Sequence, residues 1–288
     1  MLKPIPITIR ELSTLAEAEE CEDLQLKIWP PHQGTVGFCI PIHLLVSQRD
    51  IGGVVLGAYV EERIIGFIYA VPAHDRAGRP YHYSCLAGVH PEFQHGGVME
   101  RLKWRHADIA LAQNIKQIRW TYDPLQGANA NLNIKKLGGI VKDYKINYYG
   151  IRAGGSPQNY GMPSDRFVVE WNISGHGISA PHIPASLRHV DLLNSHECSL
   201  ANTVLLDETG LPFIKDFVLD LSSRQVLVEI PDNFARIRRH TSKGNLDIEW
   251  RLKTREIFTN YLKLGYTVIG FFSENEDDRR RSFYLLEK

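Results

Sequence analysis

The sequence shows no excess of either charge, because 33 Lys and Arg residues balance 33 Asp and Glu residues. Nucleic-acid-binding domains usually carry a basic surplus, so nucleic acid is not an expected partner. No apolar run reaches the roughly 18 to 20 residues that span a membrane. The first residues, Met1 to Pro4, also lack the apolar stretch of a signal peptide. We therefore expect a cytoplasmic protein that does not bind a membrane.

Cysteine is scarce, with four residues in 288, and no two of them have Cys-x-x-Cys spacing. This excludes zinc ribbons and thioredoxin-type redox motifs. The 12 histidines are scattered, without a His-Glu-x-x-His motif or a tight cluster with acidic residues. We expect no metal and, in the cytoplasm, reduced thiols.

The first 150 residues alternate between strand and helix signals. Thr14 can cap a helix, with Glu17 placed three residues later as in a capping box. Two apolar runs separated by a short polar turn predict an antiparallel hairpin. The expected elements are strand 7–10, a helix ending before Trp29, a loop or second helix at 33–50, hairpin 54–60 and 64–70, strand 81–89, helix 98–113, strand 115–122, helix 129–137 and strand 140–149. This order predicts an α/β fold with a mixed sheet and helices packed on it, of the α+β kind.

The character of the chain changes after residue 150. Residues 151–186 are rich in Gly, Pro and Ser, interrupted by one apolar run at 167–171. Later signals predict strand 226–230, helix 246–264 and a closing strand pair at 266–272 and 282–286. We expect an N-terminal domain over 1–160, a connection over 161–186 and a smaller C-terminal α/β domain over 187–288.

The most informative segment leaves the strand at Val89 and enters the next helix through a glycine turn, Gln94-His95-Gly96-Gly97-Val98-Met99. Backbone N–H groups at a helix N-terminus lack helical partners and can bind an anion, assisted by the helix dipole. Glycine allows a ligand to approach the backbone closely. The segment predicts an anion site, and the alternative is a structural turn without a ligand.

This segment resembles motif A of the GNAT superfamily of acyltransferases, where a Gln/Arg-x-x-Gly-x-Gly/Ala turn holds the coenzyme A pyrophosphate. Gln94 and Gly97 match the pattern, whereas Met99 stands where the family prefers Gly or Ala. The resemblance implies a GNAT fold for the N-terminal domain and acetyl-CoA or another acyl-CoA as co-substrate. It assigns cofactor binding to Val89, Gln94, His95, Gly96, Gly97, Val98 and Met99.

Further matches resemble a bacterial branch of predicted GNAT proteins that has a C-terminal extension. They include residues 120–125, 129–130, 137–139, 148–150, 164–167 and 228–231, and a Trp-Arg-x-x-x-Arg-x-x-Phe pattern at 250–258. The match is poor around 172–222. The closing order of helix, Gly-Tyr, strand, turn and strand is also what a second, degenerate GNAT-like domain would show. Some genes of this branch lie beside N-acylamino acid racemases, so the resemblance implies transfer of an acetyl or succinyl group to a small-molecule amine, by analogy an amino acid.

Acyl transfer to an amine requires amine deprotonation, oxyanion stabilisation and protonation of the thiolate. GNAT domains take the oxyanion donor from the strand before motif A, which implies the N–H of Ala87, Gly88 or Val89. The tyrosine that many members use as an acid would fall at Ile134. Tyr149 and His90 are the candidate catalytic residues. A packing role for Tyr149 and an idle surface position for His90 are the alternatives.

Three residues are candidate substrate ligands. Arg251 and Arg255 lie four positions apart on a predicted helix and could bind a carboxylate together. The alternative is a salt-bridged helix face. Asp123 could bind the amine or form a turn before Pro124. Because Ile134 and Met99 depart from the family pattern, a non-catalytic CoA-binding or interaction protein on a GNAT scaffold also stays open, as does a homodimer.

Overall fold

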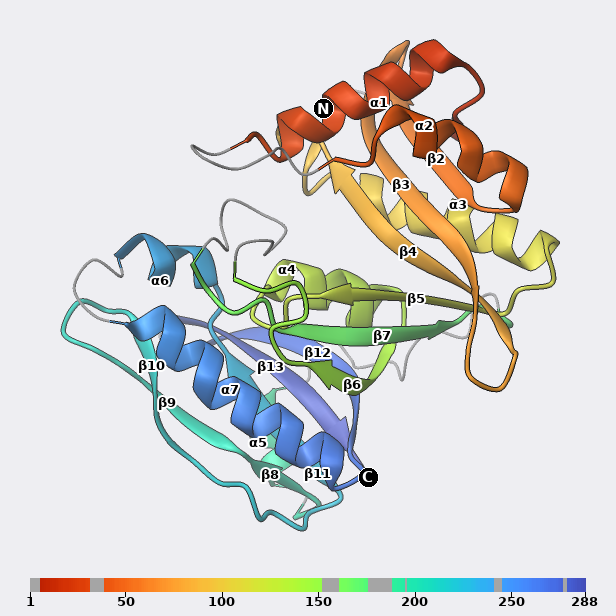
Figure 1. Cartoon of the computed structure of the whole chain (residues 1–288). Helices are drawn as coiled ribbons and strands as arrows, with labels where there is room; N and C mark the ends of the chain where they lie inside the picture. The colour runs from red at the N-terminus through yellow and green to blue at the C-terminus, as the bar shows by residue number, and fades with distance from the viewer. Residues whose placement is uncertain are drawn as a thin grey trace. The chain divides into compact units, whose positions relative to one another are not determined.

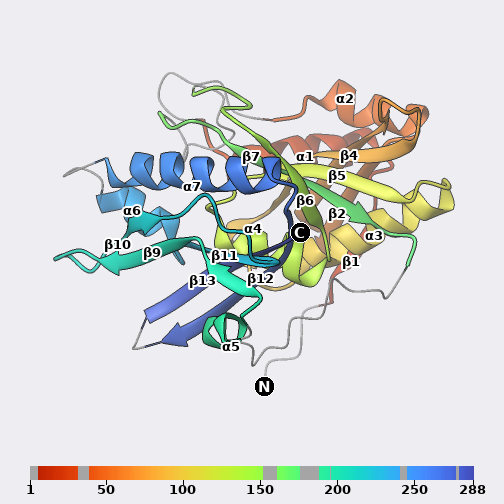
Figure 2. The same cartoon turned by 90° about the horizontal axis from the view of Figure 1, so that it is seen from below.

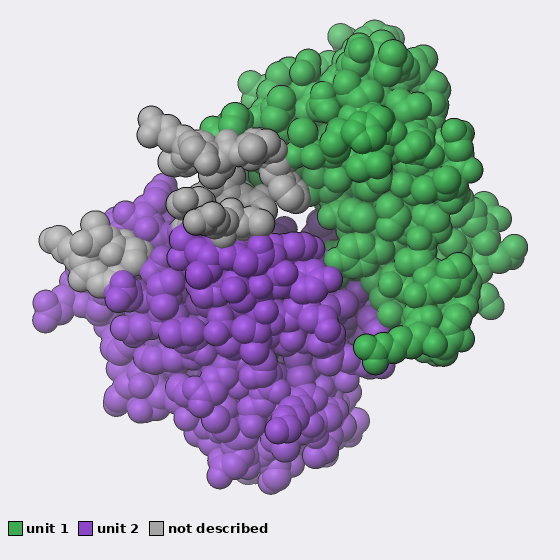
Figure 3. Space-filling view, viewed as in Figure 1, with its two compact units in different colours: residues 1–120, 155–157, 172–176 green, residues 121–154, 158–171, 177–288 purple. Residues whose placement is uncertain are grey.

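The computed structural model describes residues 6–31, 39–151, 161–175, 188–194, 196–240, 245–276 and 279–288. The chain forms two compact units (Figure 3). Unit 1 comprises residues 1–120, 155–157 and 172–176, and unit 2 comprises residues 121–154, 158–171 and 177–288. The division of function between residues 1–160 and 187–288 stays a prediction. Residues 176–186 of the predicted connection lie outside the described residues.

Unit 1 is a sheet with helices on both faces (Figure 1). Its strands follow the order β1-β2-β3-β4-β5, in which the first four are antiparallel and β5 is parallel to β4. Its elements are β1 (Thr8–Glu11), α1 (Leu15–Ile28), α2 (Ile42–Ser47), η1 (Gln48–Ile51), β2 (Val54–Val60), β3 (Arg63–His74), β4 (Pro80–Val89), η2 (Pro91–Phe93), α3 (Val98–Ala112) and the first part of β5 (Gln117–Tyr122).

Side chains alternate between the two faces of the sheet in unit 1, as expected for strands. Tyr59 and Phe67 pack with buried residues of α1 on one face. Leu56 and Ile68 pack with Val98 and other residues of α3 on the opposite face. The two helices are therefore held against opposite faces of one sheet. The predicted capping box at the start of α1 is confirmed, because Thr14 and Glu17 exchange side-chain hydrogen bonds with each other's backbone N–H.

Unit 2 contains strands in the order β7-β6-β12-β13-β11-β8 and a separate β9-β10 hairpin. Helix α7 and helix α5 cover opposite faces of the strand group (Figure 2). Phe258 of α7 packs against Tyr284 of β13, while the neighbouring Phe283 belongs to a core that includes Leu192 of α5. The elements are α4 (Gly127–Ala130), the π-helical η3 (Asn131–Lys136), β6 (Ile140–Lys145), β7 (Arg166–Asn172), α5 (His189–Leu193), β8 (Cys198–Leu200), β9 (Asn202–Leu206), β10 (Pro212–Phe217), β11 (Gln225–Ile230), α6 (Phe234–His240), α7 (Leu246–Lys263), β12 (Thr267–Glu276) and β13 (Arg279–Glu287).

The predicted fold class is confirmed, since strands of both orientations pack with helices and the element order over the first 145 residues is the expected one. The strand predicted at 140–149 is too long. It ends at Lys145, because Asn147 adopts a positive φ of 47° and its N–H donates to the Asp165 carboxylate. Sequence patterns also missed strand β7, which lies inside the predicted connection. In the structure β7 pairs with β6. Among the described residues, no helix combines the length and apolarity needed to cross a membrane.

Candidate active site

The C-terminal end of β4 presents backbone N–H groups on both of its edges. The N–H of His90 donates to the Ile65 carbonyl, toward β3, at 2.8 Å. Because backbone groups of an antiparallel strand alternate between edges, the N–H of Gly88 points the same way, and those of Ala87 and Val89 point away from β3. The predicted oxyanion donors are thereby reduced to Ala87 and Val89.

A β-bulge and close packing shape this strand. Leu86 pairs with Tyr69 and Ser84 pairs with Ala70, so Cys85 is an extra residue between them. Gly88 is needed on the face toward α1, because an added Cβ would come within 2.8 Å of side-chain atoms of both Ile28 and Trp29. The close approach of α1 to β4 therefore depends on the absence of a side chain at position 88.

The glycine turn has the geometry of a helix N-terminus open to a ligand. Gly97 is the N-cap of α3 with a φ of 75°, and no side chain caps the helix there. The first helical bond runs from the N–H of Arg101 to the carbonyl of Gly97, so the N–H groups of Val98 and Met99 precede the helical ladder. His95 also has a positive φ, 66°, which bends the turn tightly. The sequence prediction of a strand, a glycine turn and a helix is confirmed.

Two side chains of the turn point back into unit 1. The Gln94 amide donates to the Val89 carbonyl at 3.2 Å and ties the turn to the end of β4. The Met99 side chain packs against the buried cluster that contains Val98 and Leu102. An added Cβ on Gly66 would contact side chains of these same two residues at 3.2 Å, so Gly66 allows α3 to lie close to β3. The longer residue at position 99 is accommodated in the core.

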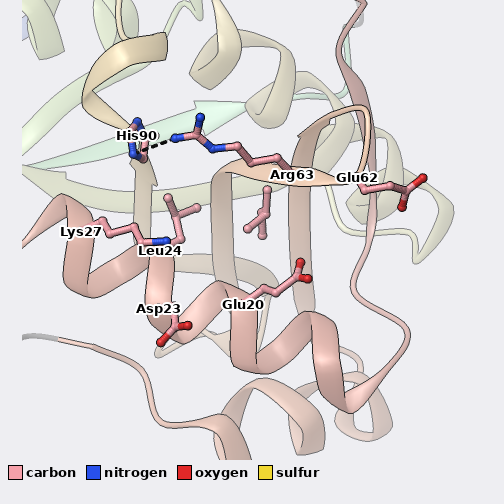
Figure 4. Close-up of a pocket in the computed structure, with 8 residues that line it drawn as sticks. Glu20, Asp23, Leu24, Lys27, Glu62, Arg63 and His90 are labelled. Carbon is pink, nitrogen blue, oxygen red and sulfur yellow. Dashed lines mark hydrogen bonds between the residues drawn. The ribbon is translucent and has the colours of Figure 1, made fainter.

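His90 lines a hollow of about 200 Å³ between α1 and the start of β3 (Figure 4). Its Nε2 lies 3.1 Å from Nη2 of Arg63. Arginine has only donors, so this nitrogen of His90 accepts the hydrogen bond. Figure 4 shows the Arg63 guanidinium extended toward the ring. His90 would have to exchange this bond before it could take a proton from a substrate. The hollow is lined by Glu20, Asp23, Leu24, Lys27, Glu62, Arg63, Ile64 and His90.

Tyr149 belongs to unit 2 and follows β6 in a turn. Its hydroxyl lies 3.0 Å from the Thr121 hydroxyl, and 39% of the residue is exposed. The Arg166 guanidinium lies over its ring at 5.4 Å from the centroid. Ile134, where the resemblance to GNAT proteins would place a tyrosine, is fully buried. Tyr149 therefore offers an accessible phenol, whereas position 134 offers no polar group at all.

Asp123 and Arg251 bind each other. The Asp123 Oδ2 accepts from Arg251 Nη2 at 2.5 Å, and the side chains are 4% and 0% exposed. Burial lowers the pKa of the Arg251 guanidinium, but the charge of Asp123 and its hydrogen bond outweigh that effect and raise it overall. The other oxygen of Asp123 accepts from the Leu125 N–H at 2.9 Å, as in a turn. A substrate carboxylate would have to displace Asp123 to reach Arg251.

Arg255 pairs with a different carboxylate. Its Nε and Nη2 donate to the two oxygens of Asp165 at 2.8 and 2.9 Å. Asp165 is completely buried and also accepts from the Tyr144 hydroxyl at 2.7 Å. The two arginines thus lie on one helix face as predicted, and each already has an aspartate partner.

Unit 1 contains a buried basic group that sequence patterns did not single out. Lys103 of α3 is 4% exposed, its Nζ donates to Ser84 Oγ at 3.1 Å, and it lies 3.9 Å from the centroid of the Trp120 ring. Burial lowers the pKa of Lys103 to about 7. Beside it, the rings of His82 and His106 are stacked, with Nδ1 of His82 3.1 Å from Nε2 of His106.

One group of residues in unit 2 has the composition of a metal site. Ligand atoms of His189, Glu274 and Glu276 lie within 4.8 Å of one another. Two arginines, however, are bonded within the same group. Arg281 donates to Glu276 and lies 3.2 Å from Nε2 of His189, while Nη2 of Arg188 lies 3.8 Å from Glu276. A cation would compete with these guanidinium groups, so the cluster is better described as an ionic network.

The chain is similar to solved GNAT acetyltransferases. The acetyltransferase of the GNAT family from Streptococcus pneumoniae has 13% identity and a TM-score of 0.47, over 58% of this chain and 99% of that one. The ribosomal-protein-S18-alanine N-acetyltransferase from Escherichia coli has 15% identity and a TM-score of 0.45, over 60% and 97%. The PaiA N-acetyltransferase from Thermoplasma acidophilum, in complex with coenzyme A, has 18% identity and a TM-score of 0.42, over 58% and 99%.

No protein-family model matches the chain, and a search of curated proteins found no match either. At the identities and TM-scores given above, the substrates of the three enzymes carry no weight for this chain.

Proposed function

We propose that the chain is an acyl-CoA-dependent N-acyltransferase that moves an acetyl or succinyl group from coenzyme A to the amine of a small molecule, such as an amino acid. The observation that carries this proposal is the end of β4. Two N–H groups there, of Ala87 and Val89, point away from β3. The same strand leads directly into a helix N-terminus that is open at Gly97.

The two features suit two parts of one ligand. The N–H groups of Val98 and Met99 at the start of α3 would bind the pyrophosphate, favoured by the positive end of the helix dipole. Gly96 and Gly97 would allow the phosphates close to the backbone, and Gln94 would hold the turn against Val89. The N–H of Ala87 or Val89 would bind the thioester carbonyl and stabilise its oxygen when it becomes an oxyanion.

The remaining assignments follow from the chemistry of the side chains. Tyr149 carries an accessible phenol and is the proposed acid for the thiolate. His90 is the base proposed from sequence, on condition that it releases Arg63. For Asp123, Arg251 and Arg255, substrate binding requires that the buried ion pairs open. We therefore propose that these three residues shape unit 2 in the resting protein.

Two measurements test the function. Calorimetric titration with CoA, acetyl-CoA and succinyl-CoA should show binding of at least one of them. A panel of acyl-CoA donors against pooled D- and L-amino acids, read by mass spectrometry, should then show an N-acylated product together with free thiol. Absence of binding to all three ligands would contradict the proposal.

The buried Ile134 favours one alternative, because the acid that many GNAT proteins use is missing. In that case the chain would be a CoA-binding or interaction protein on a GNAT scaffold. Binding of CoA without thiol release from any donor, across the whole amine panel, is the result expected from this alternative. Release of thiol that depends on an added amine would exclude it.

A further inference from the structure

We propose that Ser84 and Lys103 form the proton-accepting pair of the transfer reaction, in which Ser84 receives a proton from the acceptor amine while passing its own proton to Lys103. This inference rests on the proposed function and adds a base to it. Neither residue belongs to the glycine turn, and neither was a candidate from the sequence.

Lys103 is a buried amine that has no counter-ion among the residues that the structure describes. Only 4% of the residue is exposed, and no described carboxylate contributes to the shift of its pKa. Its Nζ contacts the Ser84 hydroxyl and the face of the Trp120 ring. A charged ammonium is costly in such surroundings unless it is paired. The neutral amine, which is a base, is the form that this environment favours.

The titratable surroundings support the same conclusion. Burial lowers the pKa of Lys103 to about 7, so the neutral amine is well populated near neutral pH. Within the described part of unit 1, the neighbouring titratable groups are His106 on the same helix and His82 on β4. Burial lowers the pKa of both histidines as well, and for His106 the charge of Lys103 adds to the effect. At neutral pH these rings are uncharged and place no second positive charge beside the amine.

Ser84 lies on β4 where this strand separates from β5. This strand pairs with β5 at His82 and Tyr83, and Ser84 is the next residue. Ser84 and Lys103 therefore lie just beyond the last residue of β4 that pairs with β5. Ala87, a proposed thioester donor, lies three residues further along, at most about 10 Å at the rise of a strand. The bulge at Cys85 shortens this span. An amine nitrogen beside the carbonyl, with one bridging water, can cover it.

The proton and bond changes balance. The acceptor ammonium gives one proton, through the bridging water, to Ser84 Oγ. The Ser84 hydroxyl, which accepts from Lys103 Nζ in the structure, turns to donate its own proton to the neutral amine of Lys103, and the acceptor amine becomes a nucleophile. The nitrogen–carbon bond forms and the carbon–sulfur bond breaks. The second proton leaves the nitrogen and ends on the thiolate of coenzyme A. Lys103 releases its proton to water before the next cycle, and Ser84 is unchanged.

The decisive experiment compares Lys103→Met with a matched variant, Arg105→Met, which removes an exposed cation from the same helix. For each protein, kcat/KM is measured from pH 5.5 to 9 with acetyl-CoA or succinyl-CoA, whichever the wild type uses, and the amino acid that the panel identifies. The Kd for the same donor is measured in parallel.

We expect Lys103→Met to lower kcat/KM by about 10² to 10⁴, the usual range for loss of a general base. Its Kd should remain that of the wild type. The wild type and Arg105→Met should both show a kcat/KM that increases with pH up to about 7, and Lys103→Met should lose this increase. The kcat/KM of Ser84→Ala should be at least about tenfold below that of the wild type, because a water must replace the Ser84 hydroxyl.

Three results would overturn the inference. The first is a kcat/KM of Lys103→Met within about threefold of the wild type. The second is a kcat/KM of that variant that still increases with pH up to about 7. If Lys103→Met does not fold by circular dichroism, Ser84→Ala decides, and a wild-type rate for it is the third. A wild type that turns over no donor contradicts the proposed function itself, and the inference falls with it. If the wild type and Lys103→Met are both active, only the role of Lys103 is contradicted and the proposed function stands.

Discussion

Arg251 of α7 is completely buried, and its Nη2 donates to the Asp123 carboxylate at 2.5 Å across 128 positions of sequence. Two further nitrogens of the same guanidinium, Nε and Nη1, are buried without a hydrogen-bond partner among the described residues. A buried pair of this kind is weak evidence for net stability, but breaking it leaves an isolated charge. We therefore expect a change in this pair to affect the stability of the fold rather than catalysis.

We predict that Arg251→Met lowers the free energy of unfolding by about 3 kcal/mol, because the Asp123 carboxylate is left buried and unpaired. Urea unfolding monitored by circular dichroism measures the change. The double variant Asp123→Asn with Arg251→Met should lose less than the sum of the two single variants, since no charge remains.

The control for this change is Arg280→Met, which removes an arginine from the pair with Asp232. That pair is exposed, with side-chain exposures of 60% and 37%. An exposed pair contributes roughly 0 to 1 kcal/mol. Equal losses in Arg251→Met and Arg280→Met would contradict the importance that we assign to burial.

Lys103 predicts a pH dependence of stability. Burial lowers its pKa from 10.5 to about 7 in the folded chain. Between these pH values the unfolded chain binds a proton that the folded chain does not, so the free energy of unfolding increases with pH. The penalty for burying the amine is complete below about pH 7 and disappears toward pH 10.5. Lys103→Met should be more stable than the wild type by about 4 kcal/mol at pH 7.

Urea unfolding of both proteins at pH 7 and pH 9 measures this effect. The stability difference should shrink by at least about 1 kcal/mol between the two pH values, because the wild type gains and the variant does not. Parallel changes in the two proteins would mean that Lys103 titrates normally. If Lys103→Met is more stable but less active than the wild type, the buried amine destabilises the fold and serves the reaction, as expected for a base.

Local signals in the sequence located most elements of unit 1. The capping box at Thr14 depends on residues three positions apart, and the β2–β3 hairpin depends on two adjoining apolar runs. The glycine turn was equally readable, because Gly97 must adopt a positive φ where β4 meets α3. Each of these features is determined by neighbours in sequence, which a single chain is sufficient to show.

Long-range pairing could not be read in the same way. Asp123 and Arg251 were each predicted as ligands of a substrate, although the structure pairs them with each other. Lys103 looks like an ordinary surface lysine in the sequence, and only the packing of α3 on β4 buries it. Tyr149 moved from a predicted strand to a turn, because the carboxylate of Asp165 binds the backbone of Asn147.

The glycine turn predicts a selective loss of coenzyme A binding. Gly97→Ala places a Cβ on a residue with a φ of 75°, at the proposed pyrophosphate site. Gly78→Ala, in the β3–β4 turn, imposes the same kind of strain at a φ of 76°. Neither added Cβ has an atom within 4 Å, so steric effects within the protein are matched. Each variant should lose about 1 kcal/mol of stability.

Only Gly97→Ala should weaken CoA binding, by about tenfold in Kd, which corresponds to about 1.4 kcal/mol. Isothermal titration of both variants with CoA measures the difference. Equal affinities would show that the turn does not hold the ligand, whatever the fate of the fold.

Tyr149 and its neighbour Tyr148 allow a matched comparison of two phenylalanine substitutions. The two rings lie 4.8 Å apart, and both residues are exposed, at 39% and 48%. Only Tyr149 has its hydroxyl bonded to Thr121, at 3.0 Å. If the Tyr149 phenol protonates the departing thiolate, Tyr149→Phe should lower kcat by at least about tenfold while the Kd for acyl-CoA stays constant. Tyr148→Phe should keep the wild-type kcat. Stopped-flow detection of the free thiol measures both, and a Tyr149→Phe rate equal to that of Tyr148→Phe would leave the thiolate to be protonated by water.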